Sequence, residues 1–176
     1  MNSSSVSIRA CEERDVPAIA AIYHYHVLHS PATFELEPPG VEEMMARRAH
    51  FLEKGFPYLV AERDGEVIGY AYAGPYRTRP AYRFTVENSV YVRPGNLRQG
   101  VGQRLMTALL GECARQGFRQ VIAVIGDSAN QASIRLHEKL GFSPVGTLRS
   151  VGFKFDRWYD SVLMQRELDA DDRLNR

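Results

Sequence analysis

The stretch that most constrains the fold is a predicted strand that runs through a glycine-bearing loop into a predicted helix. β-Branched and aromatic residues fill Thr85–Val92, and its valines share one parity, which predicts a strand. Gly100 and Gly102 follow, and from Val101 onward apolar residues recur every fourth position, which predicts one face of a helix. The helical positions are Val101, Leu105, Leu109 and Cys113, with Met106 and Leu110 alongside.

A strand, a glycine loop and a helix start in succession make a candidate anion site. The first N–H groups of a helix lack partners inside it, and glycine lets a phosphate approach the backbone. The dinucleotide fingerprint fits poorly, because it needs a glycine where this chain has Leu105. A phosphate-binding P-loop needs Lys and Ser or Thr where Gly100 is followed by Val101 and Gly102. A glycine turn that only begins a core helix therefore remains an alternative.

Size and charge narrow the class of protein. The chain has 176 residues, of which 44% are hydrophobic, and we expect one domain over 1–176 with a core over about 6–168 and frayed tails at 1–5 and 169–176. A formal net charge of +1 gives no electrostatic case for nucleic acid or an anionic membrane as partner. Positive charge is concentrated locally, which suits an acidic or phosphorylated ligand. The clustered arginines are Arg77, Arg79, Arg83, Arg93 and Arg98.

Cysteine and histidine usage predicts a reducing compartment and no metal. Cys11 and Cys113 form no CxxC pair, so we interpret them as reduced core thiols of a cytoplasmic protein. The first five residues lack the features of a signal peptide, and no apolar run has membrane-spanning length. His26 and His29 can share a helix face, but no carboxylate or cysteine completes a metal set with them.

The remaining segments predict the order β-α-α-β-β-β-α-β-α-β-β, an α/β (α+β) fold with a mixed sheet and helices on both faces. Besides Thr85–Val92, the expected strands are Ser7–Ala10, Tyr58–Glu62, Val67–Ala73, Arg119–Ile125, Pro144–Thr147 and Phe155–Leu168. The other expected helices follow an N-cap at Asp15, span Val41–Lys54, and run from Ser128 or Asn130 to Gly141. The nearly all-apolar strand from Arg119 to Ile125 is expected to be covered on both faces. The ligand site should lie where the chain leaves Val92 for Gly100.

This order, the loop Arg98–Gly102 and the segment Asn130–Phe142 together resemble the GNAT N-acetyltransferases. The resemblance is closer to the branch that acetylates phosphinothricin and methionine sulfoximine. The residues that carry it are Tyr72–Pro75, Arg79 with Ala81–Tyr82, Glu87–Val92, Val124–Gly126, Arg135–Glu138 and Val151–Lys154, within a span of roughly Ile8 to Leu168. The glycine loop alone is weakly specific, whereas the ensemble in this order is strongly so. It implies a mostly antiparallel sheet of about seven strands, splayed at an acetyl-CoA site.

The resemblance also implies how acetyl-CoA would bind. The backbone of Val90, Tyr91 and Val92 would hold the pantetheine arm like an added strand, and Asn130 and Ser133 would contact it further along. Backbone N–H groups of the loop and helix start would hold the pyrophosphate. These residues are Arg98, Gln99, Gly100, Val101, Gly102 and Gln103. The chain departs from the family at Leu97, where Gln or Arg is usual, and we expect binding to survive because the contacts are mostly from backbone.

Two residues are candidates for acid–base chemistry in acetyl transfer. Glu87, a carboxylate in an otherwise apolar strand, is the candidate base for the amine, and its alternative is an ion pair with an arginine such as Arg83. His137 stands where the family commonly has Tyr and could give or take a proton; its alternative is a histidine bonded to a backbone carbonyl. Either residue could protonate the leaving thiolate. A backbone N–H near Val90 would hold the oxyanion.

Four residues are candidates for substrate contact. Arg79 and Tyr82 could bind an anionic substrate, because a guanidinium matches a carboxylate or phosphinate and a phenol adds a donor. By resemblance, Phe34 and Lys154 would form further pocket walls, with a core aromatic and a solvated lysine as the alternatives.

We therefore expect an acetyl-CoA-dependent N-acetyltransferase that acts on the α-amine of a small acidic amino-acid analogue. The alternatives are an acetyltransferase for protein N-termini or another small amine, and a CoA-binding sensor without catalysis. The family implies a homodimer, which the apolar final strand supports because it needs a cover.

Overall fold

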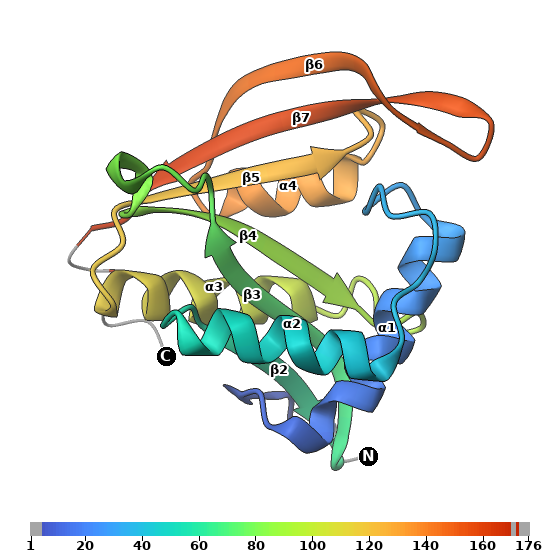
Figure 1. Cartoon of the computed structure of the whole chain (residues 1–176), viewed down its shortest axis with the longest axis vertical. Coiled ribbons are helices and arrows are strands. Elements are labelled where there is room, and N and C mark those ends of the chain that lie inside the picture. The colour runs from blue at the N-terminus through green and yellow to red at the C-terminus, as the bar shows by residue number, and fades with distance from the viewer. Residues whose placement is uncertain (1–4, 170–171, 173–176) are drawn as a thin grey trace.

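The computed structural model describes residues 5–169 and 172, and its seven strands form one sheet in the order β1-β2-β3-β4-β5-β7-β6 (Figure 1). The strands are β1 (Ser7–Ala10), β2 (Tyr58–Arg63), β3 (Glu66–Pro75), β4 (Thr85–Val92), β5 (Gln120–Gly126), β6 (Ser143–Lys154) and β7 (Arg157–Glu167). The helices are α1 (Val16–His29), α2 (Val41–Glu53), α3 (Val101–Arg115) and α4 (Gln131–Lys139), with 3-10 turns at Glu13–Asp15 and Pro80–Tyr82. The predicted order and fold class are confirmed.

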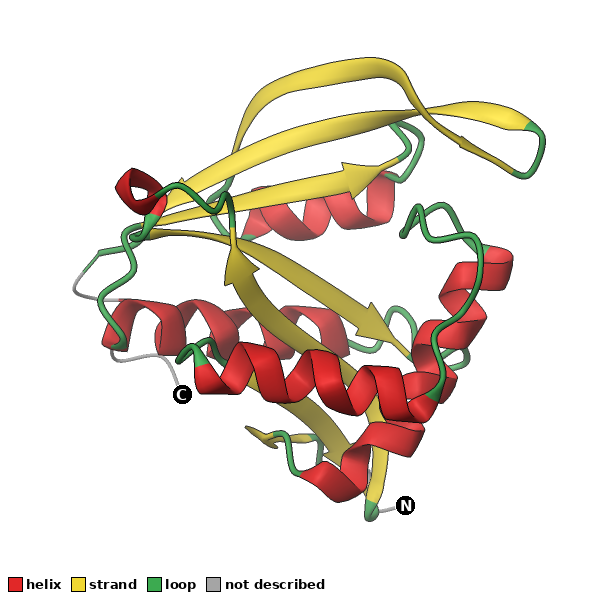
Figure 2. Ribbon diagram, in the orientation of Figure 1, coloured by secondary structure: helices red, strands yellow, loops and turns green. Residues whose placement is uncertain are grey.

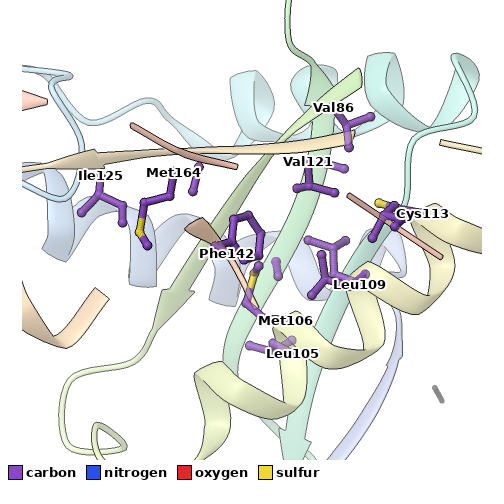
Figure 3. Packing of buried hydrophobic residues seen from close by; sticks show 14 of the residues in the cluster. Val86, Leu105, Met106, Leu109, Cys113, Val121, Ile125, Phe142 and Met164 are labelled. Atoms are coloured by element: carbon purple, nitrogen blue, oxygen red, sulfur yellow. The ribbon is translucent and has the colours of Figure 1, made fainter. Parts of the chain in front are cut away.

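Helices cover both faces of the sheet (Figure 2). On one face α1 and α2 pack over β2, β3 and β4, above a cluster rich in tyrosine rings. On the other face, α3 lies under β2 to β4 and α4 packs against β5. The apolar positions predicted for α3 are all buried in the cluster between this helix and the sheet, as Figure 3 shows for Leu105, Met106 and Leu109. Two separate layers of apolar packing therefore fix the sheet from both sides.

The sheet divides between β4 and β5. Among the described strands this is the one parallel pairing, and it runs only from Thr85 opposite Gln120 to Asn88 opposite Ala123. β3, in contrast, pairs with β4 from Pro75 opposite Val86 to Gly69 opposite Val92, the last residue of β4. In Figure 1, β4 and β5 begin side by side and then diverge. Beyond Asn88, β4 has a free edge, so the splay implied by the family resemblance is present.

Several expectations about the second half of the chain were wrong in detail. β5 is covered on one face only, since Val124 is 40% exposed on the other. β6 continues to Lys154, well past Thr147, and pairs with β7 through two register shifts. Most β6 side chains are exposed on both faces, so its sequence lacks the apolar alternation by which strands are recognised. The hairpin projects beyond the helices as an arm (Figure 1).

Two terminal expectations also need correction. Asp15 is the N-cap residue of α1, as expected, but its carboxylate makes no capping bond to the helix and instead accepts hydrogen bonds from Arg9 and from the N–H of Glu12. Asp172 lies in the stretch expected to fray, yet it is buried and ion-paired with Arg166. The rest of the expected tails, apart from Ser5 and Asp169, lies outside the described residues.

An ion cluster ties β1 to β2 and to the start of α1. Arg9 donates in bidentate fashion to Asp15 at 2.7 and 2.9 Å and also to Glu62 at 2.6 Å. The Asp15 side chain is 5% exposed, and the hydrogen bonds from Arg9 lower the pKa of its carboxyl. Removal of Arg9 would leave a buried carboxylate without its cation, which is far more costly than loss of an exposed pair.

We predict that Arg9→Met lowers the free energy of unfolding at pH 7 by about 2 kcal/mol. A carboxyl whose pKa is lowered by folding stabilises the native state above its unfolded pKa and loses that contribution as pH falls. The deficit should therefore shrink toward pH 3 in urea denaturation. Arg14→Met, which breaks the exposed pair with Glu12, should change stability by less than about 0.5 kcal/mol. A pH-independent deficit would contradict this account.

Candidate active site

A cavity of about 290 Å³ opens at the point where β4 and β5 part. Its walls come from β3, β4, β5, β7, α4 with its N-cap, and the segment 31–34 that follows α1. The lining side chains discussed below are Phe34, Tyr72, Glu87, Asn130, Ser133 and His137. Two distant parts of the chain thus meet at a break in the sheet, where ligands commonly bind.

Glu87 presents an unpaired carboxylate to this cavity. No hydrogen bond or ion pair reaches it from another described residue, and burial raises the pKa of its carboxyl. The alternative of a pair with Arg83 is wrong, because that guanidinium donates to Pro80 O and lies 4.5 Å from the centre of the Phe84 ring. A half-buried carboxylate with a raised pKa and no partner is well suited to accept a proton.

His137 lies on the other side of the cavity and is 2% exposed. Its Nδ1 is 2.8 Å from Ser133 O and its Nε2 is 3.0 Å from Asn88 Nδ2. A carbonyl can only accept, so Nδ1 carries the proton and Nε2 accepts from the amide. Burial lowers the pKa of the imidazole, which favours this neutral form. His137 therefore combines both features that the sequence offered as alternatives: it is bonded to a backbone carbonyl, and it lines the cavity.

The break in the sheet explains how these two groups come to share a cavity. Successive side chains of a strand point to opposite faces. Glu87 lines the cavity beside Tyr72, whereas Asn88 points toward α3, within 3.6 Å of Met106 Sδ, and meets His137 there. If β4 stayed paired with β5 beyond Asn88, the sheet would separate Glu87 from His137.

The free edge of β4 offers backbone groups to a ligand. The N–H of Arg93 donates to Ile68 O in the β3 direction at 2.8 Å. By alternation, the N–H and C=O groups of Val90 and Val92 point away from β3, toward the opening. Val92 O accepts a bond of 2.9 Å from His26 Nε2, which the sequence did not indicate. An extended, amide-bearing ligand could pair with this edge as an added strand.

The loop before α3 exposes the start of that helix. Gly100 is the N-cap with φ +76°, and Arg98 also has a positive φ of +60°. The first intrahelical bond runs from Arg104 N to Gly100 O, so the N–H groups of residues 101–103 have no partner within the helix. Leu97 is 56% exposed and contributes no polar group here. The arrangement is that of an anion site made from backbone.

The side chains around this loop are partly engaged. Gln99 Oε1 accepts from Arg63 at 2.8 Å, and Gln103 Oε1 accepts from Lys139 at 2.9 Å. Asn130 Oδ1 caps α4 by accepting from the N–H of Ser133 at 3.2 Å, as its N-cap position predicted. Its amide NH2 is therefore the group left to donate into the cavity.

The predicted substrate residues do not all meet at the cavity. Phe34 lines it, but Arg79 and Tyr82 are exposed in the segment before β4 and do not belong to its walls. The Tyr82 ring packs edge-on against Tyr76 at 5.6 Å. Lys154 is 3% exposed, and its Nζ donates to Ser30 O and Thr33 O, so it is neither a solvated lysine nor a wall of the cavity.

Sequence reasoning missed two features of the site. Tyr72 is a wall residue, whereas the sequence marks it only as part of the motif Tyr72–Pro75 that carries the family resemblance. Pro31, Ala32 and Thr33 also line the cavity, although they belong to an irregular segment with no recognisable signal. Among the described wall residues, Glu87 is the one with a formal charge at neutral pH.

Within residues 5–169 and 172, no group of three or more His, Cys, Asp or Glu side chains is placed to hold a metal ion. None of the helices in the described part of the chain combines the length and apolar character needed to cross a bilayer.

Comparison with known proteins points to one family. A model of the GNAT acetyltransferase domain matches residues 8–163. The chain is similar to phosphinothricin N-acetyltransferase of Alcaligenes faecalis, with 54% identity over 94% of this chain and 84% of the relative. It is similar to L-methionine sulfoximine/L-methionine sulfone acetyltransferase of Salmonella typhimurium, with 39% identity over 93% and 95%. A solved structure of a phosphinothricin acetyltransferase from Sinorhizobium meliloti, in complex with AcCoA, superposes with a TM-score of 0.90 at 44% identity, covering 93% of this chain and 88% of that one.

The isolation of Glu87 has a consequence for stability. A carboxyl whose pKa folding raises opposes the native state once it is ionised, so its cost appears as pH rises above the unfolded pKa of about 4.3. We predict that Glu87→Gln raises the free energy of unfolding at pH 7, and that the gain disappears near pH 4. Urea denaturation at both pH values measures this. Glu37→Gln, at an exposed position, should change stability at neither pH; a loss of stability in Glu87→Gln at pH 7 would show that the carboxylate has a partner.

Proposed function

The chain belongs to the GNAT acetyltransferases, and we propose that it transfers acetyl from acetyl-CoA to the α-amine of a small acidic amino-acid analogue such as phosphinothricin or methionine sulfoximine. One observation carries the proposal. An unpaired, half-buried carboxylate, Glu87, and a neutral imidazole, His137, line the same cavity beside a free strand edge. The relatives that carry these substrates in their names match the chain over nearly its whole length.

The residues present fit acetyl-CoA. The C=O of Val90 and the N–H of Val92, which point away from β3, suit the amides of a pantetheine arm, and the amide NH2 of Asn130 can donate to it from the start of α4. The N–H groups of Val101 to Gln103 suit a pyrophosphate. Acetyl-CoA supplies the thioester; every other part of the mechanism belongs to the chain.

Glu87 acts first in the proposed reaction. An α-amine is mostly protonated at neutral pH, and the ionised carboxylate accepts this proton, directly or through a water. The neutral nitrogen then forms its bond to the thioester carbon, and the backbone N–H of Val90 donates to the resulting oxyanion. As the C–S bond breaks, the nitrogen loses its second proton and the departing sulfur gains one. Glu87 and His137 are the two groups that can relay this proton.

The anionic group of the substrate needs a cationic partner. The described residues that line the cavity include no lysine or arginine. We assign this role to Arg79, assisted by Tyr82, because both lie in the segment that leads directly into the strand of Glu87. Phe34 would pack against the apolar part of the substrate.

We also propose a homodimer in the cytoplasm. The β6–β7 arm carries large exposed apolar side chains, more than a monomer surface normally groups together. They are Val145, Leu148, Val151, Phe153, Phe155 and Trp158. A second copy is the occupant that we assign to this surface, since the most exposed apolar rings of the chain lie on one projecting hairpin. The thiols of Cys11 and Cys113 are free and buried, which is compatible with a reducing compartment.

The direct test is thiol release from acetyl-CoA by purified protein with a panel of amines. Turnover with phosphinothricin and methionine sulfoximine, and none with glutamate, methionine or N-terminal peptides, is the expected result. Turnover with peptides alone would replace this proposal by N-terminal protein acetylation. Binding of acetyl-CoA without turnover of any amine would favour a sensor.

We predict that Glu87→Gln lowers kcat/KM by roughly 10²- to 10⁴-fold and that the wild-type fall in rate toward low pH is lost in this variant. The sign follows from the raised pKa, because Glu87 must be ionised to act and becomes protonated as pH falls. His137→Gln should lower the rate without removing this acid limb. Glu37→Gln is the matched control, and unchanged turnover in the first two variants would remove both residues from the mechanism.

We predict that Trp158→Asp shifts the protein from dimer to monomer in sedimentation. The residue is 61% exposed in the single chain, so the substitution should leave the thermal unfolding of the monomer nearly unchanged. A dimer that survives both Trp158→Asp and Phe153→Asp would place the interface elsewhere.

A further inference from the structure

The buried ammonium of Lys154 is not accounted for by the proposed reaction. It lies at the end of β6, is 3% exposed, and donates to two backbone carbonyls, Ser30 O at 2.9 Å and Thr33 O at 2.8 Å. These partners are 124 and 121 residues away in sequence. Both belong to the segment 30–35 between α1 and α2, part of which lines the cavity.

We propose that Lys154 is a positioning residue that holds segment 30–35 across the opening between β4 and β5, and that it does not contact the amine substrate. The inference rests on the proposed function, because it assigns this segment to the substrate side of the same cavity. Nζ is already directed at two carbonyls, and Lys154 is absent from the described residues that line the cavity.

Two glycines independently show that this segment is docked closely. A Cβ at Gly126 would lie 2.1 Å from Pro31 O, and a Cβ at Gly152 would lie 2.4 Å from Phe34 Cε2. Real Cβ atoms do not approach other atoms this closely, so β5 and β6 each carry a glycine where the segment rests on them. Lys154 is two residues after Gly152. The glycine on which the segment packs and the lysine that bonds it therefore lie on the same strand.

The helical side of the segment is fixed by different contacts. Tyr23 OH lies 2.8 Å from Thr33 Oγ1 and donates to Glu35 Oε1 at 2.9 Å. Arg47 of α2 completes this side with an ion pair to Glu35 at 2.6 Å. The hydrogen bonds of Lys154 thus connect the segment to β6, on the β5–β7–β6 side of the break in the sheet.

Burial lowers the pKa of the Lys154 ammonium, and Glu35 opposes that effect from the far side of the segment. Lys154→Met would leave the carbonyls of Ser30 and Thr33 without their donor, so the segment should detach from β6 while its bonds to Tyr23 remain. Gly152→Ala should displace Phe34 and loosen the same segment with Lys154 intact. The two variants therefore test one role through different atoms.

Hydrogen exchange of the apoprotein and steady-state kinetics test the inference together. We expect roughly tenfold faster amide exchange in peptides covering residues 30–35 in both variants. We expect KM to rise roughly tenfold for phosphinothricin and equally for methionine sulfoximine, whose side chain lacks the phosphinate anion, with KM for acetyl-CoA unchanged. Lys54→Met, at an exposed position, is the control and should leave exchange and kinetics as in the wild type.

Two results would overturn the inference. A rise in KM confined to phosphinothricin, with exchange of residues 30–35 unchanged, would show that Lys154 binds the phosphinate of the substrate. Unchanged exchange and kinetics would show that it has no role at this site. If the wild type acetylates none of these amines, the proposed function fails, and the exchange measurement still decides whether Lys154 holds the segment.

Discussion

The parting of β4 from β5 after Asn88 is the constraint on which the site depends. A paired strand has no backbone groups to offer, whereas a split strand has a row of them that need partners. Here His26 bonds one of these groups, Val92 O, and Val90 lines the cavity. The break also removes the barrier between the two faces of the sheet. For that reason a carboxylate from one face and an imidazole from the other reach one space.

The electrostatics of the site follow from a partly buried carboxylate that has no cation or hydrogen-bond donor beside it among the described residues. Elsewhere in the chain a buried carboxylate such as Asp15 has a bidentate arginine. Glu87 has no such partner among the described residues, and desolvation raises the pKa of its carboxyl. His137 is held neutral by burial and oriented by Ser133 and Asn88. A site that leaves one carboxylate unpaired sacrifices native-state stability for a group that can accept a proton.

The walls of the cavity depend on contacts between distant segments. The loop after α1 rests on Gly126 and Gly152 and is bonded by Lys154, all of which come from the last third of the chain. The same part of the chain extends past the helices as the exposed β6–β7 arm. The C-terminal hairpin therefore links the cavity to the surface that we assign to a second copy.

The sequence by itself determined the elements, their order and the family. Apolar residues alternate in Thr85–Val92 and recur at every fourth position from Val101. Each pattern reflects burial on one face, so local periodicity was sufficient to predict β4 and α3. It also named Glu87, His137, Phe34 and Asn130, which line the cavity. It found only Pro144–Thr147 of β6, because the exposed faces of that strand leave no periodic signal, and for β5 apolar composition did not reveal that Val124 is exposed.

Only the tertiary structure decided which candidates meet. It placed Lys154 against backbone carbonyls, left Arg79 and Tyr82 outside the cavity, and separated Glu87 from Arg83. The physical reason is that periodicity records whether a side chain is buried, while its partners are set by contacts over more than a hundred residues, such as that between Lys154 and Thr33.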